Sequence, residues 1–412
     1  MSAPGLYLHV PFCSAICPYC DFAVTRGGPE RRAAYVEAAV AEAALWSTDR
    51  PAQTATAGVE SSPEFEVPWI GTPFDTVYLG GGTPSILTAE QLERMLAALR
   101  GRLPVAPDAR LFLEANPEDA SPEKLRELRE LGVSTLSLGV QSFEARALKF
   151  LGRRHGPEEA RRAVEAALAV GFPTVSVDLI FGLPPLGMER RQGLDSLERT
   201  LEETVALSPH HVSGYQLTFH EGTPFGRGLA RGVIRELPEP AQAAAYERVL
   251  EALTAAGYEP YEVSNFARRT LDGADHRSAH NRKYWDHTPY LGLGPGAHSF
   301  DGRRRWWNER DEEAWRRRIA AGERPVAGEE TLSDAELALE ALMLGLRTAE
   351  GVDLERFRER FGVDLVARNE ALVARLVADG LVEVAEGRLR PTLRGFAVAD
   401  GLPVGFEVAP SP

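Results

Sequence analysis

The sequence contains few thiols and few lysines. Only three of its 412 residues are cysteines, and only three are lysines, so arginine supplies nearly all of the positive charge. Acidic side chains outnumber basic ones by 60 to 46, which gives a net charge of −14 at pH 7. A protein that binds nucleic acid without sequence preference needs a basic surface. We therefore expect no nucleic-acid partner.

Long apolar segments are also lacking. No hydrophobic run approaches the roughly 18 residues of a membrane-spanning helix. Residues 1–5 have neither the charged nor the apolar region of a signal peptide. Such low cysteine usage excludes a disulfide scaffold and favours a reducing compartment. We expect a cytoplasmic protein with no transmembrane segment.

The three cysteines that do occur lie within eight residues, in the pattern Cys13-x3-Cys17-x2-Cys20. This spacing is typical of a [4Fe–4S] cluster with three protein ligands. Four irons and three thiolates leave one iron open to a small molecule, as catalytic zinc sites keep a free position. Zinc itself fits poorly, because Asp21 is the only nearby candidate for a fourth ligand.

Short β-rich runs alternate with helical patterns over the first half of the chain. The expected strands are 6–10, 76–79, 111–114, 135–140, 175–181 and 212–217. The expected helices between them are 30–46, 88–100, 121–131, 157–170 and 194–207. Thr88 and Gln91 predict a capping box at the start of the second helix. The alternation predicts a parallel α/β sheet. We favour a partial (β/α)6 TIM-like barrel over a doubly wound sheet, because polar residues follow the strand ends.

Three regions are expected along the chain. Residues 1–235 form the barrel, with an exposed insertion at 49–73. Residues 236–330 form a connecting region rich in His, Trp and Gly. Residues 331–412 suggest three helices and a small hairpin through Glu386-Gly387, which resembles a winged helix. Because this last region has no basic recognition face, we interpret it as a packing or partner domain.

The residues around the cysteines resemble a known family. Tyr7-Leu-His-Val-Pro-Phe before Cys13, with Pro-Tyr between Cys17 and Cys20, is similar to the cluster loop of radical S-adenosylmethionine (SAM) proteins. Among these it resembles the anaerobic coproporphyrinogen-III oxidase family. The resemblance implies that the methionyl amino and carboxylate groups of SAM chelate the open iron.

Glycines and polar residues at the expected strand ends complete a candidate SAM site. A glycine run after the second strand lets a ligand approach the backbone, although a plain tight turn explains it equally well. Carboxylates and amides can hold ribose hydroxyls, and an arginine can pair with the methionyl carboxylate. Alone, each such residue is more often a cap or a surface group. The resemblance implies SAM contact by Tyr7, Gly80, Gly81, Gly82, Thr83, Glu114, Gln141, Arg153 and Asp178.

Four of the nine histidines lie within 23 residues: His276, His280, His287 and His298. A neutral imidazole can ligate heme iron, and neighbouring rings can cover a macrocycle. The ordinary alternative is a buried, hydrogen-bonded histidine beside an aromatic core. The pattern His280-Asn-x-x-Tyr284-Trp285 resembles the signature of the HemW subfamily of heme chaperones. The resemblance implies heme contact by His280, Tyr284 and Trp285, with His298 as a competing ligand.

Two functions fit these patterns. The first is a heme chaperone that carries a [4Fe–4S] cluster and SAM and transfers heme to an acceptor protein. It has no assigned catalytic residue, and an electron donor for the cluster is a further partner. The second is an oxygen-independent coproporphyrinogen III dehydrogenase, which oxidises propionate side chains by radical chemistry.

Two departures from the dehydrogenase pattern favour the chaperone. The dehydrogenases carry another cysteine two residues after the third cluster ligand, where this chain has Phe22. They also have a substantial N-terminal extension, whereas only five residues precede Leu6 here. Enzymatic activity is kept as an alternative, because the sequence has a matching residue at every position where the family contacts SAM.

Overall fold

The computed structural model describes residues 2–47, 72–184, 190–269 and 273–409. The insertion expected at 49–73 therefore lies outside the described residues, except for its last two. Within the described part, one twelve-stranded sheet runs in the order β12-β11-β10-β9-β1-β2-β3-β4-β5-β6-β8-β7. A separate three-stranded sheet lies in the C-terminal part of the chain.

The centre of the large sheet is parallel, as the alternation of strands and helices predicts. Each of the six expected strands pairs in parallel with the next along the chain. They are β1 (Gly5–Val10), β2 (Phe74–Gly81), β3 (Val105–Ala115), β4 (Val133–Gln141), β5 (Thr174–Phe181) and β6 (His211–Gln216). In the described residues the outermost strands β12 and β7 do not pair with each other, so the arrangement is an open, partial (β/α)6 barrel.

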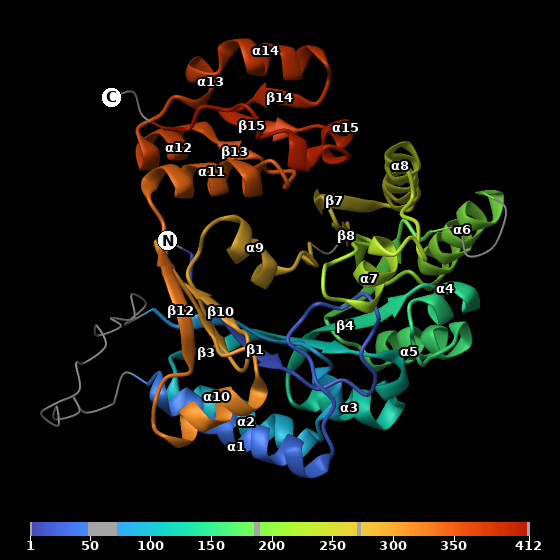
Figure 1. Cartoon of the computed structure of the whole chain (residues 1–412), viewed down its shortest axis with the longest axis vertical. Helices are drawn as coiled ribbons and strands as arrows, with labels where there is room; N and C mark the ends of the chain where they lie inside the picture. The colour runs from blue at the N-terminus through green and yellow to red at the C-terminus, as the bar shows by residue number, and fades with distance from the viewer. Residues whose placement is uncertain (1, 48–71, 185–189, 270–272, 410–412) are drawn as a thin grey trace, which may run out of the picture.

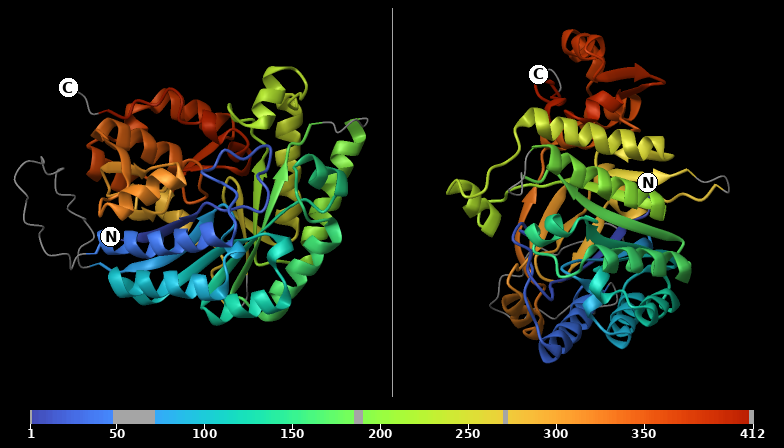
Figure 2. Two further views of the ribbon diagram at one scale, coloured as in Figure 1. Left: turned by 60° about the horizontal axis from the view of Figure 1, so that its bottom comes forward. Right: turned by 90° about the vertical axis from the view of Figure 1, so that its right-hand side faces the viewer.

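Helices connect these strands and pack along one side of them (Figures 1 and 2). They are α1 (Pro29–Leu45), α2 (Ala89–Arg102), α3 (Pro122–Glu130), α4 (Ala145–Phe150), α5 (Pro157–Val170) and α6 (Arg190–Leu207). The capping box expected at α2 is confirmed, because the Thr88 side chain accepts from the Gln91 backbone N–H and the Gln91 side chain accepts from the Thr88 backbone N–H. Alternate residues of the strands fill the core beneath the helices; Val175, Val177 and Leu179 of β5 are all buried.

The sheet is longer than the sequence pattern predicts. On one side, β9 (Tyr290–Leu293) pairs in parallel with β1 and is followed by three antiparallel-paired strands. These are β10 (His298–Phe300), β11 (Arg304–Asn308) and β12 (Val326–Thr331). On the other side, β8 (Asn265–Arg268) and β7 (Tyr258–Glu262) extend β6. Further helices are α7 (Pro224–Ala230), α8 (Glu239–Ala255), α9 (Ala279–Trp285) and α10 (Glu312–Ala320).

The C-terminal part contains the expected helices and hairpin, with its own cluster of buried apolar side chains. It lies at the opposite end of the molecule from α1 and α2 (Figure 1). Its elements are α11 (Asp334–Gly345), β13 (Val352–Asp353), α12 (Leu354–Phe361), α13 (Leu365–Arg368), α14 (Glu370–Ala378), β14 (Val382–Ala385), β15 (Arg388–Pro391) and α15 (Leu393–Phe396). The β14–β15 turn has φ of 52° at Glu386 and 72° at Gly387, as a two-residue hairpin turn requires.

None of the described helices combines the length and the apolar composition needed to cross a bilayer.

Candidate cluster and SAM site

A cavity of about 420 Å³ lies at the C-terminal ends of the parallel strands. Strands β2, β3, β4, β5 and β6 contribute to its lining, together with the loop that follows β1. It brings together most of the residues that the sequence nominated for the cluster and SAM. These are Cys13, Cys17, Cys20, Gly81, Gly82, Thr83, Glu114, Gln141, Arg153 and Asp178.

The cysteine loop exposes its thiols to this cavity. Cys13, Cys17 and Cys20 are all partly buried and form no disulfide. Thr83 Oγ1 lies 3.6 Å from the sulfur of Cys13, and Arg153 Nη1 lies 3.6 Å from the sulfur of Cys17. A hydroxyl and a guanidinium that donate to sulfur stabilise the thiolate, which is the form that binds metal.

The thiols fit an iron–sulfur cluster. Burial raises the pKa of Cys13 to about 11 and also raises the pKa of Cys20, so iron has to displace their protons. Among the described residues, no three His, Cys, Asp or Glu side chains are grouped to hold a single metal ion. The assignment to a cluster therefore depends on the spacing of the cysteines, on the cavity that they share and on the donors to their sulfurs.

Close contacts with neighbouring backbone explain the glycines at the end of β2. Gly81 has φ of +107°. A Cβ atom on Gly82 would lie 2.7 Å from the carbonyl oxygen of Phe12 and 2.8 Å from that of Val10. The Gly82 N–H donates to Val10, and the Thr83 N–H donates to Phe12, each at 2.8 Å. The glycines are thus needed to seat the end of β2 against the segment that enters the cysteine loop.

Two half-buried carboxylates lie on neighbouring parts of the cavity wall. Glu114 accepts from the Tyr78 hydroxyl at 2.8 Å and from the Gly81 N–H at 3.0 Å. Asp178 accepts from the Ser137 hydroxyl at 3.0 Å. Burial raises the pKa of Glu114 to about 7, with a further increase from the charge of Asp178, and raises that of Asp178 to about 6. Perturbed acids in a cavity are typical of a ligand site.

Arg153 and Gln141 have features that the folded chain alone leaves unexplained. Arg153 Nη2 donates to the carbonyl oxygen of Gly139 at 2.8 Å, but its buried Nε–H has no hydrogen-bond partner in the described part of the chain. Gln141 has φ of +67°, which is uncommon for a residue other than glycine, and it follows an irregularity in the β4–β5 register. Unpaired buried donors and strained backbone concentrate at functional sites.

Asn116 and Ser137 are two of the cavity residues that were not predicted from the sequence. Asn116 donates to the Thr83 hydroxyl at 3.0 Å and accepts from Arg153, so it links the glycine run to the arginine. Ser137 holds Asp178 as described above. Both could have been found by following each strand to its end with a two-residue period, since Asn116 lies two residues after Glu114 and Ser137 lies two and four residues before Gly139 and Gln141.

Tyr7 and Gly80 do not line the cavity; they lie behind it. The Tyr7 hydroxyl is 3.1 Å from His9 Nδ1, and His9 Nε2 is 2.9 Å from the carbonyl oxygen of Ala23. Because a carbonyl can only accept, His9 donates to Ala23 and Tyr7 donates to His9. This chain of hydrogen bonds ties β1 to the segment that follows the cysteine loop, which is a positioning role.

His280 lies elsewhere, in the interior between α9 and β2. Its side chain is 1% exposed, and both ring nitrogens have partners. Nδ1 lies 2.9 Å from Thr76 Oγ1, and Nε2 lies 2.9 Å from the Tyr284 hydroxyl. Burial, with the charge of Lys283, lowers the pKa of His280 to about 3. The geometry is that of a buried, hydrogen-bonded histidine, and it leaves neither nitrogen for the heme iron that the sequence led us to expect there.

His298 and Trp285, which were also considered for heme contact, lie in different places. His298 is exposed on β10, where its ring centroid lies 5.9 Å from that of Trp307. Trp285, at the end of α9, lines a second cavity against the C-terminal part of the chain. Among the signature residues, His280 and Tyr284 therefore lie together in the interior, whereas Trp285 faces the second cavity.

Comparison with known proteins identifies the family. Residues 67–197 match the Radical SAM superfamily, and residues 332–398 match the HemN C-terminal domain. The chain is 37% identical to the heme chaperone HemW of Mycobacterium tuberculosis, over 97% of this chain and 93% of that one. The chain belongs to the HemW family of radical SAM proteins. HemW of Bacillus subtilis is 32% identical, over 94% and 95% of the two chains.

A solved structure confirms the fold. Coproporphyrinogen III oxidase (HemN) from Escherichia coli, described as a radical SAM enzyme, aligns with a TM-score of 0.75 at 22% identity. The alignment covers 97% of this chain and 89% of HemN. The expected radical SAM α/β fold with a helical C-terminal region is therefore correct for this member of the HemW family.

We predict that Cys13, Cys17 and Cys20 are each required for a [4Fe–4S] cluster. Replacing any one with alanine removes a thiolate that no other cysteine in the chain can replace. Iron and sulfide analysis with EPR spectra after anaerobic reconstitution should show loss of the intact cluster. Asp21→Asn is the matched control and should keep it. A triple alanine variant with full cluster content would rule out these ligands.

We predict that Glu114→Gln and Asp178→Asn each weaken SAM binding. Each substitution removes a half-buried carboxylate acceptor, which is worth ~1.5–3 kcal/mol when the partner hydroxyl is desolvated. Calorimetry on the reconstituted protein should show the loss, whereas Glu123→Gln on the exposed face of α3 should leave affinity unchanged. Wild-type affinity in both cavity variants, with the cluster intact, would mean that SAM does not contact these carboxylates.

Proposed function

We propose that this protein is a heme chaperone that carries a [4Fe–4S] cluster and SAM and delivers heme to an acceptor protein. The observation that carries the proposal is the match, along nearly the whole chain, to relatives named heme chaperone HemW. The cavity supports it, because the residues that a cluster and SAM would need line one space.

In this proposal Cys13, Cys17 and Cys20 hold the cluster. When bound, the cluster supplies an open iron for SAM and a site that can accept one electron. Glu114 and Asp178 accept hydrogen bonds from hydroxyl groups, while the unpaired Nε–H of Arg153 is available to a carboxylate. An electron donor for the cluster and a reducing compartment such as the cytoplasm belong to the same proposal.

The second candidate is a coproporphyrinogen III dehydrogenase, which the fold of HemN favours. Likeness of fold does not decide function, because one fold hosts many activities. The residue that argues against the dehydrogenase is Phe22, which stands where the dehydrogenases resembled have a further cysteine. Phe22 lines the cluster cavity and is 65% exposed, so the site offers an apolar ring in place of a thiol.

We predict that the anaerobically reconstituted protein binds about one heme per chain and does not convert coproporphyrinogen III to protoporphyrinogen IX. Heme titration followed by absorbance, and product analysis in the same sample with SAM and a reductant, would check both parts. The Phe22→Cys variant introduces the cysteine of the dehydrogenase pattern, and we expect that it also does not convert coproporphyrinogen III. Conversion by the wild-type protein at an enzymatic rate would make the dehydrogenase the correct function.

A further inference from the structure

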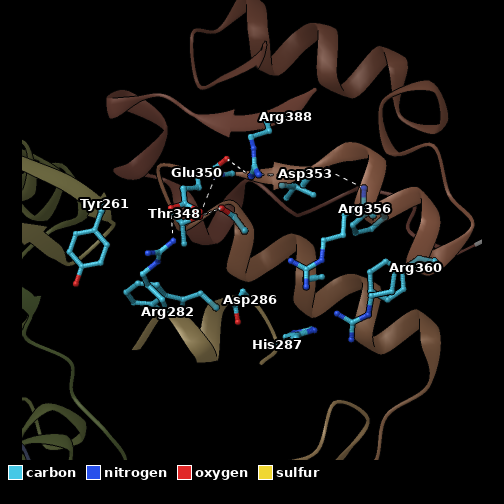
Figure 3. Close-up of a pocket in the computed structure, with 17 residues that line it drawn as sticks. Tyr261, Arg282, Asp286, His287, Thr348, Glu350, Asp353, Arg356, Arg360 and Arg388 are labelled. Atoms are coloured by element: carbon cyan, nitrogen blue, oxygen red, sulfur yellow. Dashed lines mark hydrogen bonds and ion pairs between the residues drawn. The ribbon is translucent and has the colours of Figure 1, made fainter. Parts of the chain in front are cut away.

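The second cavity, of about 320 Å³, separates α9 from the C-terminal part of the chain (Figure 3). Its walls come from the end of α9 and the following turn, from α11, and from the segment that runs through β13 into α12, with Tyr261 of β7 and Arg388 of β15. None of the described residues lines both this cavity and the cluster cavity. Helix α9, which carries His280, Tyr284 and Trp285, therefore borders a cavity that is distinct from the cluster cavity.

His287 is the most unusual residue of this second cavity. Its side chain is 8% exposed, yet neither ring nitrogen has a hydrogen-bond partner among the residues that the structure describes. The nearest acid is Glu340, whose Oε2 lies 3.7 Å from Nε2, beyond hydrogen-bond distance, and which is engaged by Arg305 at 2.8 Å. A buried polar group without a partner costs ~1–3 kcal/mol, so His287 needs an explanation.

Packing alone explains His287 poorly. Its ring meets Phe300 edge to face, with 5.7 Å between centroids, a contact that any aromatic side chain could make. Its φ of +58° is uncommon for a residue other than glycine. Burial and the nearby Arg360 lower the pKa of His287 to about 4, so the ring is neutral near pH 7 and keeps a free lone pair.

Two arginines of α12 add positive charge to the cavity, which the acidic Asp286 also lines. Arg356 and Arg360 are one helical turn apart and both line the cavity. Within the described residues, neither guanidinium forms an ion pair, whereas Arg282 and Arg388 across the cavity are paired with Glu350 and Asp353. Like charges at this spacing repel each other. Burial and the charge of Arg356 lower the pKa of Arg360 accordingly.

Figure 3 shows how these groups lie. The side chains of Arg356 and Arg360 extend from α12 toward the side on which the His287 ring is found. The indole of Trp285 forms part of the same lining. A ligand that satisfied all four side chains would combine a metal or a hydrogen-bond donor for the imidazole, a flat apolar surface for the indole, and acidic groups for the two guanidiniums.

We propose that this cavity is the heme site, with His287 as the axial ligand of the iron. Arg356 and Arg360 pair with the propionates, and Trp285 packs against the porphyrin. The inference rests on the proposed heme chaperone function and adds to it the place of the cargo. His280 is less suited, because both of its nitrogens are already bonded, and His298 is exposed and far less enclosed.

The first test removes the proposed axial ligand, the His287 imidazole. His287→Gly removes the imidazole, and because glycine adopts the left-handed conformation at no cost, the variant should remain folded. The Soret band of the protein-bound heme should shift, and added imidazole should restore the wild-type spectrum. His298→Ala is the matched histidine control and should leave the spectrum unchanged. Superimposable spectra of wild type and His287→Gly would overturn the assignment.

The second test addresses the propionates. The Arg356→Gln/Arg360→Gln variant should lower affinity for heme at least about tenfold, because two charge-assisted pairs are lost. Its affinity for heme dimethyl ester, whose carboxylates are blocked, should match that of wild type. Arg394→Gln, on α15 and outside the cavity, is the control. Unchanged affinity for heme in the double variant would reject the cavity as the site.

These outcomes separate the inference from the function on which it rests. If wild-type protein binds no heme, the proposed chaperone function fails and the site assignment fails with it. If wild type binds heme and the cavity variants do so with the same spectrum and affinity, the function stands and only the place of the heme is wrong.

Discussion

Two backbone hydrogen bonds hold the candidate cluster and SAM site together. The N–H groups of Gly82 and Thr83, at the end of β2, donate to the carbonyl oxygens of Val10 and Phe12, just before the cysteine loop. They require a glycine at position 82, because a Cβ atom would collide with both carbonyls. Through this contact the thiols of the loop come to face the carboxylates that the next strands present, and the rest of the cavity depends on it.

The parallel core and its connections could be predicted from the sequence because their signals are local. Apolar runs separated by amphipathic stretches define the six strands, Thr88 and Gln91 define a helix start, and Glu386-Gly387 defines a hairpin. The prediction for β3 was too short. Residues 105–110 include a proline and exposed polar side chains, so they lack the apolar pattern even though they extend the strand.

The outer part of the sheet could not be predicted in the same way. Strand β9 is four residues long and contains Gly292, whose missing Cβ lets the carbonyl of His298 approach closely. A short apolar run with a glycine is indistinguishable from a loop until its partner, β1, is known. The positions of Asn116 and Ser137 follow from the two-residue period of their strands, but their hydrogen bonds depend on neighbours from other segments.

The histidine-rich region shows why a motif and a site differ. His280 is fixed by Thr76, 204 residues away, and by Tyr284 one turn along α9, so its environment is a tertiary property. His287 lies outside the signature, yet the fold places it in a cavity beside Arg356 and Arg360. Within the described residues its ring nitrogens form no hydrogen bond, and the two arginines form no ion pair. We therefore propose two sites in one chain: a cluster and SAM cavity at the strand ends, and a heme cavity against the C-terminal part.

The most direct test of this separation is a heme titration of a variant that cannot hold the cluster, Cys13→Ala/Cys17→Ala/Cys20→Ala. If heme occupies its own cavity, the variant should give the same Soret spectrum, stoichiometry and affinity as the wild-type protein. Loss of heme binding in a folded variant would contradict the account, because it would place the heme at the cluster cavity.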